Sequence, residues 1–195
     1  MNSQPYALYN PAMLPPEQLL AEFTARRATL VRIIDVIRNN QPGHPPQHAL
    51  ICGPRGMGKT TILWAIAHTI NLQEPALGEI WQPVPFDEES RRVGDLADFW
   101  MECIRQWEAA TGFHGDIIDP LLDLPPDRIE DASREAFFGL VDRSGKRALL
   151  LVDNINDVFR NLNDREALHR LRAMLMEDDR LMLIGACVEL SDEVT

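Results

Sequence analysis

The stretch that decides the fold is ALICGPRGMGKTT, residues 49–61, in which a short apolar run leads into a loop with three glycines and a lysine. His48 to Cys52 predicts a buried parallel strand, because the run is short, apolar and closed by glycine. From Thr60 to Ile70, apolar residues recur at helical spacing, namely Ile62, Leu63, Ile66 and Ile70. The stretch therefore predicts a strand, a tight loop and a helix.

The loop residues 53–60 match the pattern GxxxxGKT of a phosphate-binding P-loop. Glycine lets the backbone curl until successive N–H groups point at phosphate oxygens, and the positive end of the next helix adds to the attraction. We expect Lys59 to reach the β- and γ-phosphates of ATP and the Thr60 hydroxyl to bind Mg²⁺. The predicted nucleotide-binding residues are Gly53, Pro54, Arg55, Gly56, Met57, Gly58, Lys59, Thr60 and Thr61. A glycine-rich turn that binds nothing is disfavoured, because a strand precedes the motif and a helix follows it.

A second apolar run, Ala148 to Val152, ends in Asp153 and Asn154. It predicts a buried strand that carries polar groups at its carboxyl end. A P-loop needs a carboxylate from another strand to complete the Mg²⁺ shell, so we expect Asp153 and Thr60 to be the metal ligands. The alternative is that Asp153 is only a turn or helix-cap residue. The predicted catalytic residues are Lys59, Asp153 and Asn154.

The remaining sequence alternates between helical and strand patterns. Residues 1–16 contain four prolines and predict an irregular arm, whereas residues 17–195 predict a single core that starts with one amphipathic helix of roughly twenty residues. Pro83 and Pro85 place a predicted strand at 80–86 on a sheet edge. Further helices are expected at 96–107, 127–142 and 168–175, and a last strand at 181–188. This alternation predicts an α/β fold with a mostly parallel sheet.

Composition and charge narrow the class of protein. The net charge of −11 disfavours non-specific nucleic-acid binding by the whole surface, although a local basic patch would still allow nucleic acid as a partner. Cys52, Cys103 and Cys187 are widely spaced among apolar neighbours, which predicts small core residues in a reducing compartment. No signal-peptide pattern and no run of about 20 apolar residues occurs, so we expect a cytoplasmic protein without membrane contact.

The segments GPRGMGKTT (53–61) and LLLVDN (149–154) together resemble the AAA+ superfamily, especially its origin-recognition-like and STAND-like ATPases. PVPFDEESRRVGDLADFW (83–100) and LRAMLMEDDRLMLIGA (171–186) extend the resemblance to about residues 17–190. It implies a three-layer α/β/α P-loop NTPase fold, with the P-loop strand in the middle of the sheet and the Asp153 strand beside it. It also implies a homo-oligomer that binds ATP at subunit interfaces.

The sequence departs from that family's pattern in three places. The acidic residue that usually follows the metal-binding aspartate is Asn154 here, and an amide can orient water but cannot accept its proton. Ala186 and Cys187 occupy the approximate position of the residue that senses the γ-phosphate, usually Asn, Thr or Ser. The sequence also ends before the last core strand, the arginine finger and the helical lid. We therefore expect slow hydrolysis, unless Asp157 replaces the missing acid.

The sequence thus favours a Mg-ATP-binding AAA+-type NTPase that acts as a nucleotide-dependent switch or assembly factor, with a second copy or another protein as partner. One alternative is a small P-loop kinase, although the acidic connection at 113–127 does not resemble an arginine-rich lid. The other is a non-catalytic interaction module with a vestigial P-loop, whose acidic surface docks a basic partner.

Overall fold

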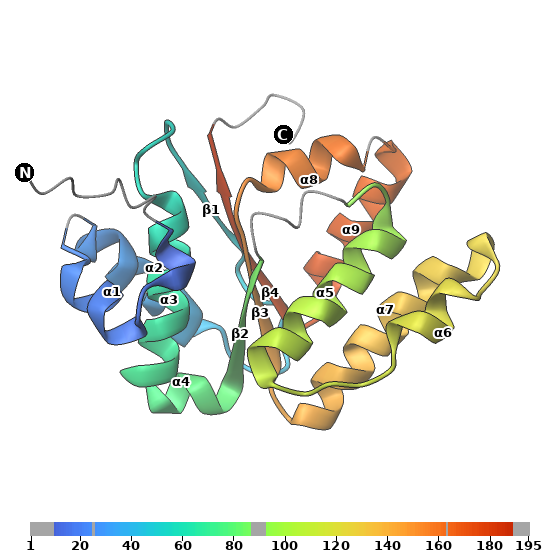
Figure 1. Ribbon diagram of the computed structural model, residues 1–195, viewed down its shortest axis with the longest axis horizontal. Helices are drawn as coiled ribbons and strands as arrows, with labels where there is room; N and C mark the ends of the chain where they lie inside the picture. The colour runs from blue at the N-terminus through green and yellow to red at the C-terminus, as the bar shows by residue number, and fades with distance from the viewer. Residues whose placement is uncertain (1–9, 25, 87–92, 163, 189–195) are drawn as a thin grey trace, which may run out of the picture.

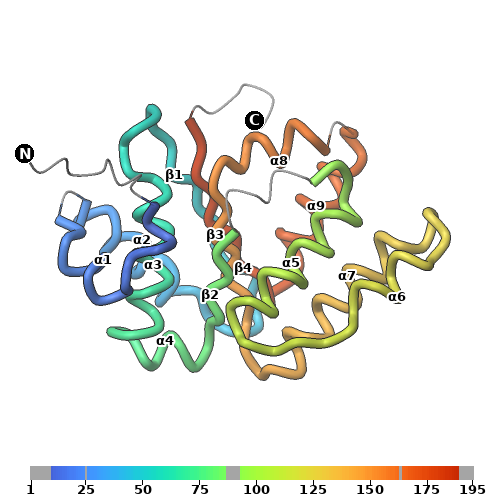
Figure 2. Tube along the Cα trace, viewed as in Figure 1, coloured from blue at the N-terminus to red at the C-terminus, as the bar shows by residue number. Residues whose placement is uncertain are grey.

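The computed structural model describes residues 10–24, 26–86, 93–162 and 164–188. Its strands form one parallel sheet in the order β1-β4-β3-β2, with helices on both faces (Figures 1 and 2). The strands are β1 (Ala49–Cys52), β2 (Trp81–Phe86), β3 (Arg147–Val152) and β4 (Leu181–Cys187). The predicted α/β/α fold with a parallel sheet is therefore confirmed.

The first helical layer is built around α3 (Lys59–Leu72), the helix that follows the P-loop sequence. α3 has buried residues on most of its sides, because it lies between the sheet and other helices. The other elements of this layer are η1 (Pro11–Met13), α1 (Pro16–Glu22), α2 (Arg27–Asn39) and α4 (Pro75–Ile80). Their core is largely aliphatic, and its side chains pack α3 against the sheet.

The expected single helix from Glu17 is wrong, because the chain forms two helices, α1 and α2. Phe23, with ψ of 84°, and Arg26, with φ of −138°, both leave helical geometry between them. A straight helix would hold Leu19 and Ile37 about 27 Å apart, whereas α3, with its 14 residues, is only about 21 Å long. The break lets both side chains reach the same core.

The second layer contains α5 (Leu96–Thr111), α6 (Ile118–Leu122), α7 (Pro126–Ser144), α8 (Ile155–Asn161) and α9 (Arg165–Glu177). Its core is aromatic. Trp100 and Trp107 pack on Phe137, with ring centroids 5.9 and 6.1 Å apart. Both tryptophans are buried, so they stabilise this layer and take no part in a surface site.

The strand order corrects one expectation drawn from the family resemblance. β1 is an edge strand of the described sheet, and β4 separates it from β3. Burial explains the arrangement, since all seven residues of β4 are buried whereas only Ile51 is buried in β1. β2 occupies the other edge, where Pro83 and Pro85 predicted it, because proline cannot donate a hydrogen bond to a neighbouring strand.

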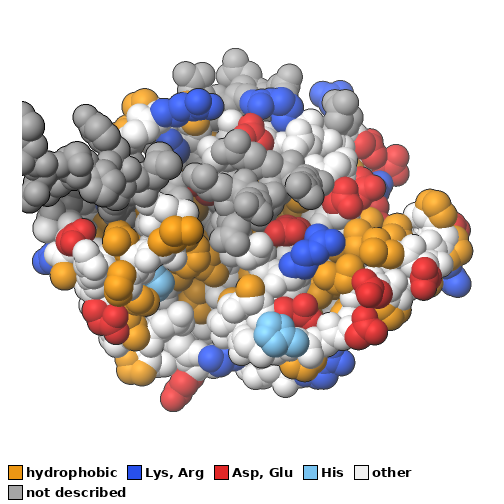
Figure 3. Space-filling model, in the orientation of Figure 1, with side chains coloured by type: hydrophobic (Ala, Val, Ile, Leu, Met, Phe, Trp, Pro, Cys, Tyr) orange, Lys and Arg blue, Asp and Glu red, His pale blue; other side chains and the backbone are white. Residues whose placement is uncertain are grey.

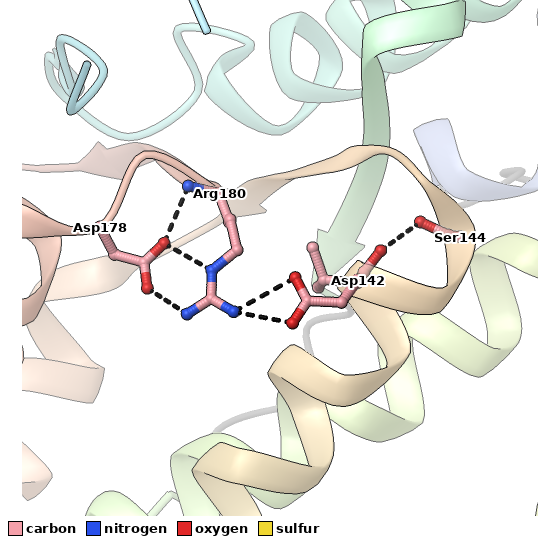
Figure 4. Close-up of polar contacts among 5 residues, drawn as sticks. Asp142, Ser144, Asp178 and Arg180 are labelled. Atoms are coloured by element: carbon pink, nitrogen blue, oxygen red, sulfur yellow. Dashed lines mark hydrogen bonds and ion pairs between the residues drawn. The ribbon is translucent and has the colours of Figure 1, made fainter. Parts of the chain in front are cut away.

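An arginine network joins the end of α7 to the start of β4 (Figure 4). The Arg180 guanidinium donates to Asp178 at 2.6 Å and to Asp142 at 2.9 Å, and it lies 4.3 Å from the centroid of the Phe138 ring. These contacts anchor the amino-terminal end of β4, and the P-loop follows the carboxyl end of the neighbouring strand β1. The network is therefore structural support for the sheet.

Three segments discussed above lie outside the described residues: 1–9 in the predicted arm, 87–92 in the segment 83–100, and 189–195 at the end. Within the described part of the chain, no helix combines the length and the apolar character needed to span a bilayer.

Candidate functional site

The loop after β1 has the backbone geometry that its motif requires. Gly56 and Gly58 have φ of 78° and 74°, in the left-handed region that favours glycine. Gly58 is also the N-cap of α3, so the positive end of this 14-residue helix meets the loop. The Gly53 N–H donates to the Cys187 carbonyl at 3.2 Å and ties the start of the loop to β4. The loop and the start of α8 both lie in the upper half of the molecule in Figure 1.

Lys59 is a buried cation that lies under this loop, with only 7% of its surface exposed. Its Nζ donates to the carbonyls of Gly53 at 2.7 Å and Pro54 at 3.0 Å. An ammonium group has three N–H donors, so one donor is left for a ligand. None of the salt bridges between described residues includes Lys59. Because a buried charge without a counter-charge is costly, an anion in the loop would stabilise this arrangement.

The predicted metal ligands Thr60 and Asp153 are in contact, although β4 lies between the strands that precede them. The Thr60 hydroxyl donates a short hydrogen bond to Oδ2 of Asp153. The other carboxylate oxygen accepts from the Asn154 N–H at 2.8 Å. Hydroxyl and carboxylate oxygens are ligands that suit Mg²⁺, so these two side chains would hold the ion. The residues present therefore fit a magnesium site.

Asn154 makes the turn from β3 into α8. With φ of 50° and ψ of 43°, it is the one residue other than glycine in the left-handed region among those described. Asparagine tolerates this region better than most residues. The carboxylate of Asp157, the expected substitute for the missing acid, accepts from Arg160 at 2.9 Å. This ion pair is exposed to solvent and therefore weak, so a role of Asp157 as the substitute acid stays a prediction.

Gly185 positions the site, but this role was not predicted from the sequence. A Cβ at this residue would lie 2.8 Å from Cγ2 of Ile155 and 2.9 Å from Cδ2 of Leu50. Ile155 is the first residue of α8, so the missing side chain lets the start of α8 pack directly on β4. This packing places Asp153 and Asn154 at the edge of the sheet. A glycine inside an apolar strand was the available signal, because it often marks a close approach.

The other predicted loop residues differ in exposure. Pro54, Arg55 and Met57 are exposed, and Thr61 is half-buried. The Met57 sulfur lies over Gly53, where a Cβ would approach it to 2.8 Å. Figure 3 shows Lys and Arg side chains along the upper edge of the molecule, where the loop lies.

The cysteine prediction needs one correction. Cys103 and Cys187 are buried, as expected for core residues, but Cys52 is exposed. Cys52 ends the edge strand β1, in which successive side chains alternate between burial and exposure. Its sulfur lies 2.8 Å from that of Cys187. The contact between Cys52 and Cys187 could not be predicted from the sequence, because it depends on β1 and β4 being neighbouring strands.

Neither a protein-family model nor a curated protein matches the sequence. Among solved structures, the chain is similar to the Orc1 protein of Aeropyrum pernix in complex with DNA, with a TM-score of 0.60 and 19% sequence identity. The similarity covers 88% of this chain and 42% of the Orc1 chain, so our chain spans less than half of its length. PCH-2 of C. elegans matches with a TM-score of 0.40 and 14% identity, over 92% of this chain and 37% of that one. The Orc1 similarity shows that the two chains share a P-loop NTPase-like fold.

Proposed function

We propose that this chain binds Mg-ATP at its P-loop and works as an AAA+-type NTPase, a nucleotide-dependent switch or assembly factor with slow hydrolysis. The observation that carries the proposal is the contact between Thr60 and Asp153 directly beside the loop. A fold of this kind hosts many activities, so the arrangement of these side chains is the stronger support.

Each part of the site has a role in binding the triphosphate. The loop amides between Gly53 and Thr60 and the positive end of α3 bind phosphate oxygens. Lys59 gives its remaining N–H to the β- and γ-phosphates, while the loop carbonyls hold its ammonium group in place. Thr60 and Asp153 would hold Mg²⁺, which would neutralise charge on the triphosphate.

Slow hydrolysis follows from the residues beside Asp153. Asn154 cannot act as a general base, and the carboxylate of Asp157 is paired with Arg160. General-base help contributes about 10²- to 10⁴-fold in rate. An arginine supplied by a second copy or another protein contributes roughly 10³- to 10⁵-fold, so such a partner would accelerate turnover. We propose assembly with that partner as the step that nucleotide controls.

Thermal unfolding with and without Mg-ATP tests the proposal. The chain has only two lysines, Lys59 and Lys146, so Lys146→Ala is a matched control for Lys59→Ala. At 100 times the dissociation constant, nucleotide should stabilise the wild type and Lys146→Ala by about 2.7 kcal/mol. Lys59→Ala should gain nothing. An equal gain in Lys59→Ala would overturn the assignment of this loop, and no gain in any protein would favour the non-catalytic module.

Product analysis separates an ATPase from the kinase alternative. With γ-labelled ATP, we expect slow release of inorganic phosphate that Lys59→Ala abolishes. Transfer of the label to an added small-molecule or nucleotide acceptor would instead assign the chain to the kinases.

A further inference from the structure

Two cysteines meet directly below the P-loop. Cys52 is the last residue of β1 and Cys187 is the last residue of β4, and the two are partners in the parallel register. Neighbouring strands lie about 4.8 Å apart, which falls within the Cα separation of about 4.4–6.8 Å that a disulfide requires. The Sγ atoms are already 2.8 Å apart. A bond of about 2.05 Å needs only a small further approach.

The two thiols differ in their access to solvent. Cys52 is exposed, whereas Cys187 is only 3% exposed. Burial and the contact with Cys52 raise the pKa of the Cys187 thiol to about 11. An oxidant from solvent therefore reaches Cys52 first. The buried Cys187 thiol lies close enough to the Cys52 sulfur to act as the resolving thiol. The third cysteine, Cys103, is fully buried in α5.

We propose that Cys52 and Cys187 are a redox modification site, at which a hydroperoxide converts the two thiols into an intramolecular disulfide. In the first step, the Cys52 sulfur attacks one peroxide oxygen, the O–O bond breaks, and a sulfenic acid and one water form. In the second step, the Cys187 sulfur attacks the Cys52 sulfur, and a second water leaves. The two thiols lose two electrons and two protons, and hydrogen peroxide is reduced to two waters. A dithiol reductant reverses the reaction.

The crosslink has a consequence for nucleotide that rests on the function proposed above. Cys52 precedes Gly53, whose carbonyl holds Lys59 and whose N–H donates to Cys187. The bond would fix the end of β1 to the end of β4 and restrict the backbone adjustment of the first peptide of the loop around a bound phosphate. We therefore expect the disulfide to weaken Mg-ATP binding by about tenfold, within the usual range for coupling between two sites.

Peptide mapping without reductant tests the redox chemistry. Cleavage after Lys and Arg places each cysteine in a different peptide, 39–55, 93–105 and 181–195. After mild treatment of the folded protein with hydrogen peroxide, 39–55 should be joined to 181–195 and released by dithiothreitol, while 93–105 stays reduced. Cys103→Ser should give the same crosslink, and Cys52→Ser should give none. Sulfinic acid at Cys52 without a crosslink, or a Cys52–Cys52 bond between two chains, would overturn the proposal.

Calorimetric titration of Mg-ATP into the reduced and the oxidised protein tests the consequence for nucleotide. The expected result is a dissociation constant about tenfold higher after oxidation that returns to the starting value after reduction. Equal constants for the two forms would refute control of the nucleotide site by this pair. Because the peptide map needs no nucleotide, a reduced protein that binds no ATP would count against the proposed function alone.

Discussion

Asn154 is the residue that would limit the rate of hydrolysis in the proposed function. Its left-handed backbone, with φ of 50°, begins the turn into α8, and its amide cannot take a proton from water. In the proposed function, the residue next to Asp153 therefore combines a conformational role with the lack of a general base.

Asn154→Glu should raise the rate of ATP hydrolysis toward the ~10²-fold that a general base contributes, because it restores the missing carboxylate. It should also lower the free energy of unfolding by about 1 kcal/mol, because glutamate tolerates a left-handed backbone less well than asparagine. Phosphate release and chemical denaturation measure the two effects. Asn154→Gly keeps the backbone free without adding a carboxylate, so its rate should stay at the wild-type level. A glutamate variant that is no faster would show that residue 154 does not limit the rate.

Some of the site residues could be predicted from the sequence, because phosphate and metal binding require particular residue types in a particular pattern. Lys59 and Thr60 follow from the loop motif, and Asp153 follows from an apolar strand that ends in a carboxylate. The structure brings Thr60 and Asp153 together as that argument expected. Gly185 and the cysteine pair were not predicted, because their roles depend on which strands are neighbours, and local pattern does not encode strand order.

At the scale of elements, the packing of α8 on β4 holds the site in shape. Ile155 fills the space that a side chain at Gly185 would need. The start of α8, and with it Asp153 and Asn154, is therefore located by a glycine on a different strand.

Gly185→Ala should lower the free energy of unfolding by about 1–3 kcal/mol, because the new methyl group overpacks the contact with Ile155 and Leu50. It should also weaken Mg-ATP binding by displacing Asp153. Gly139→Ala in α7 is the matched control, since no atom beyond its chain neighbours and the nearby backbone of its own helix lies within 4 Å of its Cβ position. That variant should gain roughly 1 kcal/mol from better helix propensity. Chemical denaturation of both proteins provides the comparison, and equal stabilities would contradict the packing argument.

The elements themselves were largely predictable, whereas their spatial order was not. Prolines 83 and 85 correctly placed β2 at an edge, because proline has no N–H to donate to a second neighbouring strand. The break between α1 and α2 could not be read from the sequence, since the apolar residues keep helical spacing on both sides of it. The break is needed because α3, on which both helices pack, is shorter than one continuous helix would be.

At the scale of the whole molecule, His48 connects three elements. Its Nδ1 accepts from the Leu183 N–H of β4 at 3.0 Å, and its Nε2 donates to the Leu175 carbonyl of α9 at 2.7 Å. The residue itself immediately precedes β1. This pattern requires the neutral imidazole, and burial lowers the pKa of His48 against the opposing effect of the Leu175 bond.

Stability should therefore fall as pH decreases. The unfolded chain takes up a proton near pH 6.5, whereas the folded chain resists protonation of His48 until lower pH. Burial likewise lowers the pKa of His68, against the charge of Glu17, and adds to the effect. Denaturation between about pH 7.5 and pH 5.5 should show a shallower loss for His48→Gln than for wild type. His114→Gln, at an exposed position, should keep the wild-type slope, and a wild-type slope in His48→Gln would contradict the argument.

The most direct test of the central claim, that Thr60 and Asp153 share a magnesium ion beside a phosphate-binding loop, is calorimetric titration of ATP with and without Mg²⁺. Wild type and the control Asp157→Asn should bind ATP more tightly when Mg²⁺ is present. Asp153→Asn should bind equally in both conditions, because the carboxylate that holds the metal is gone. An undiminished effect of Mg²⁺ in Asp153→Asn would contradict the account.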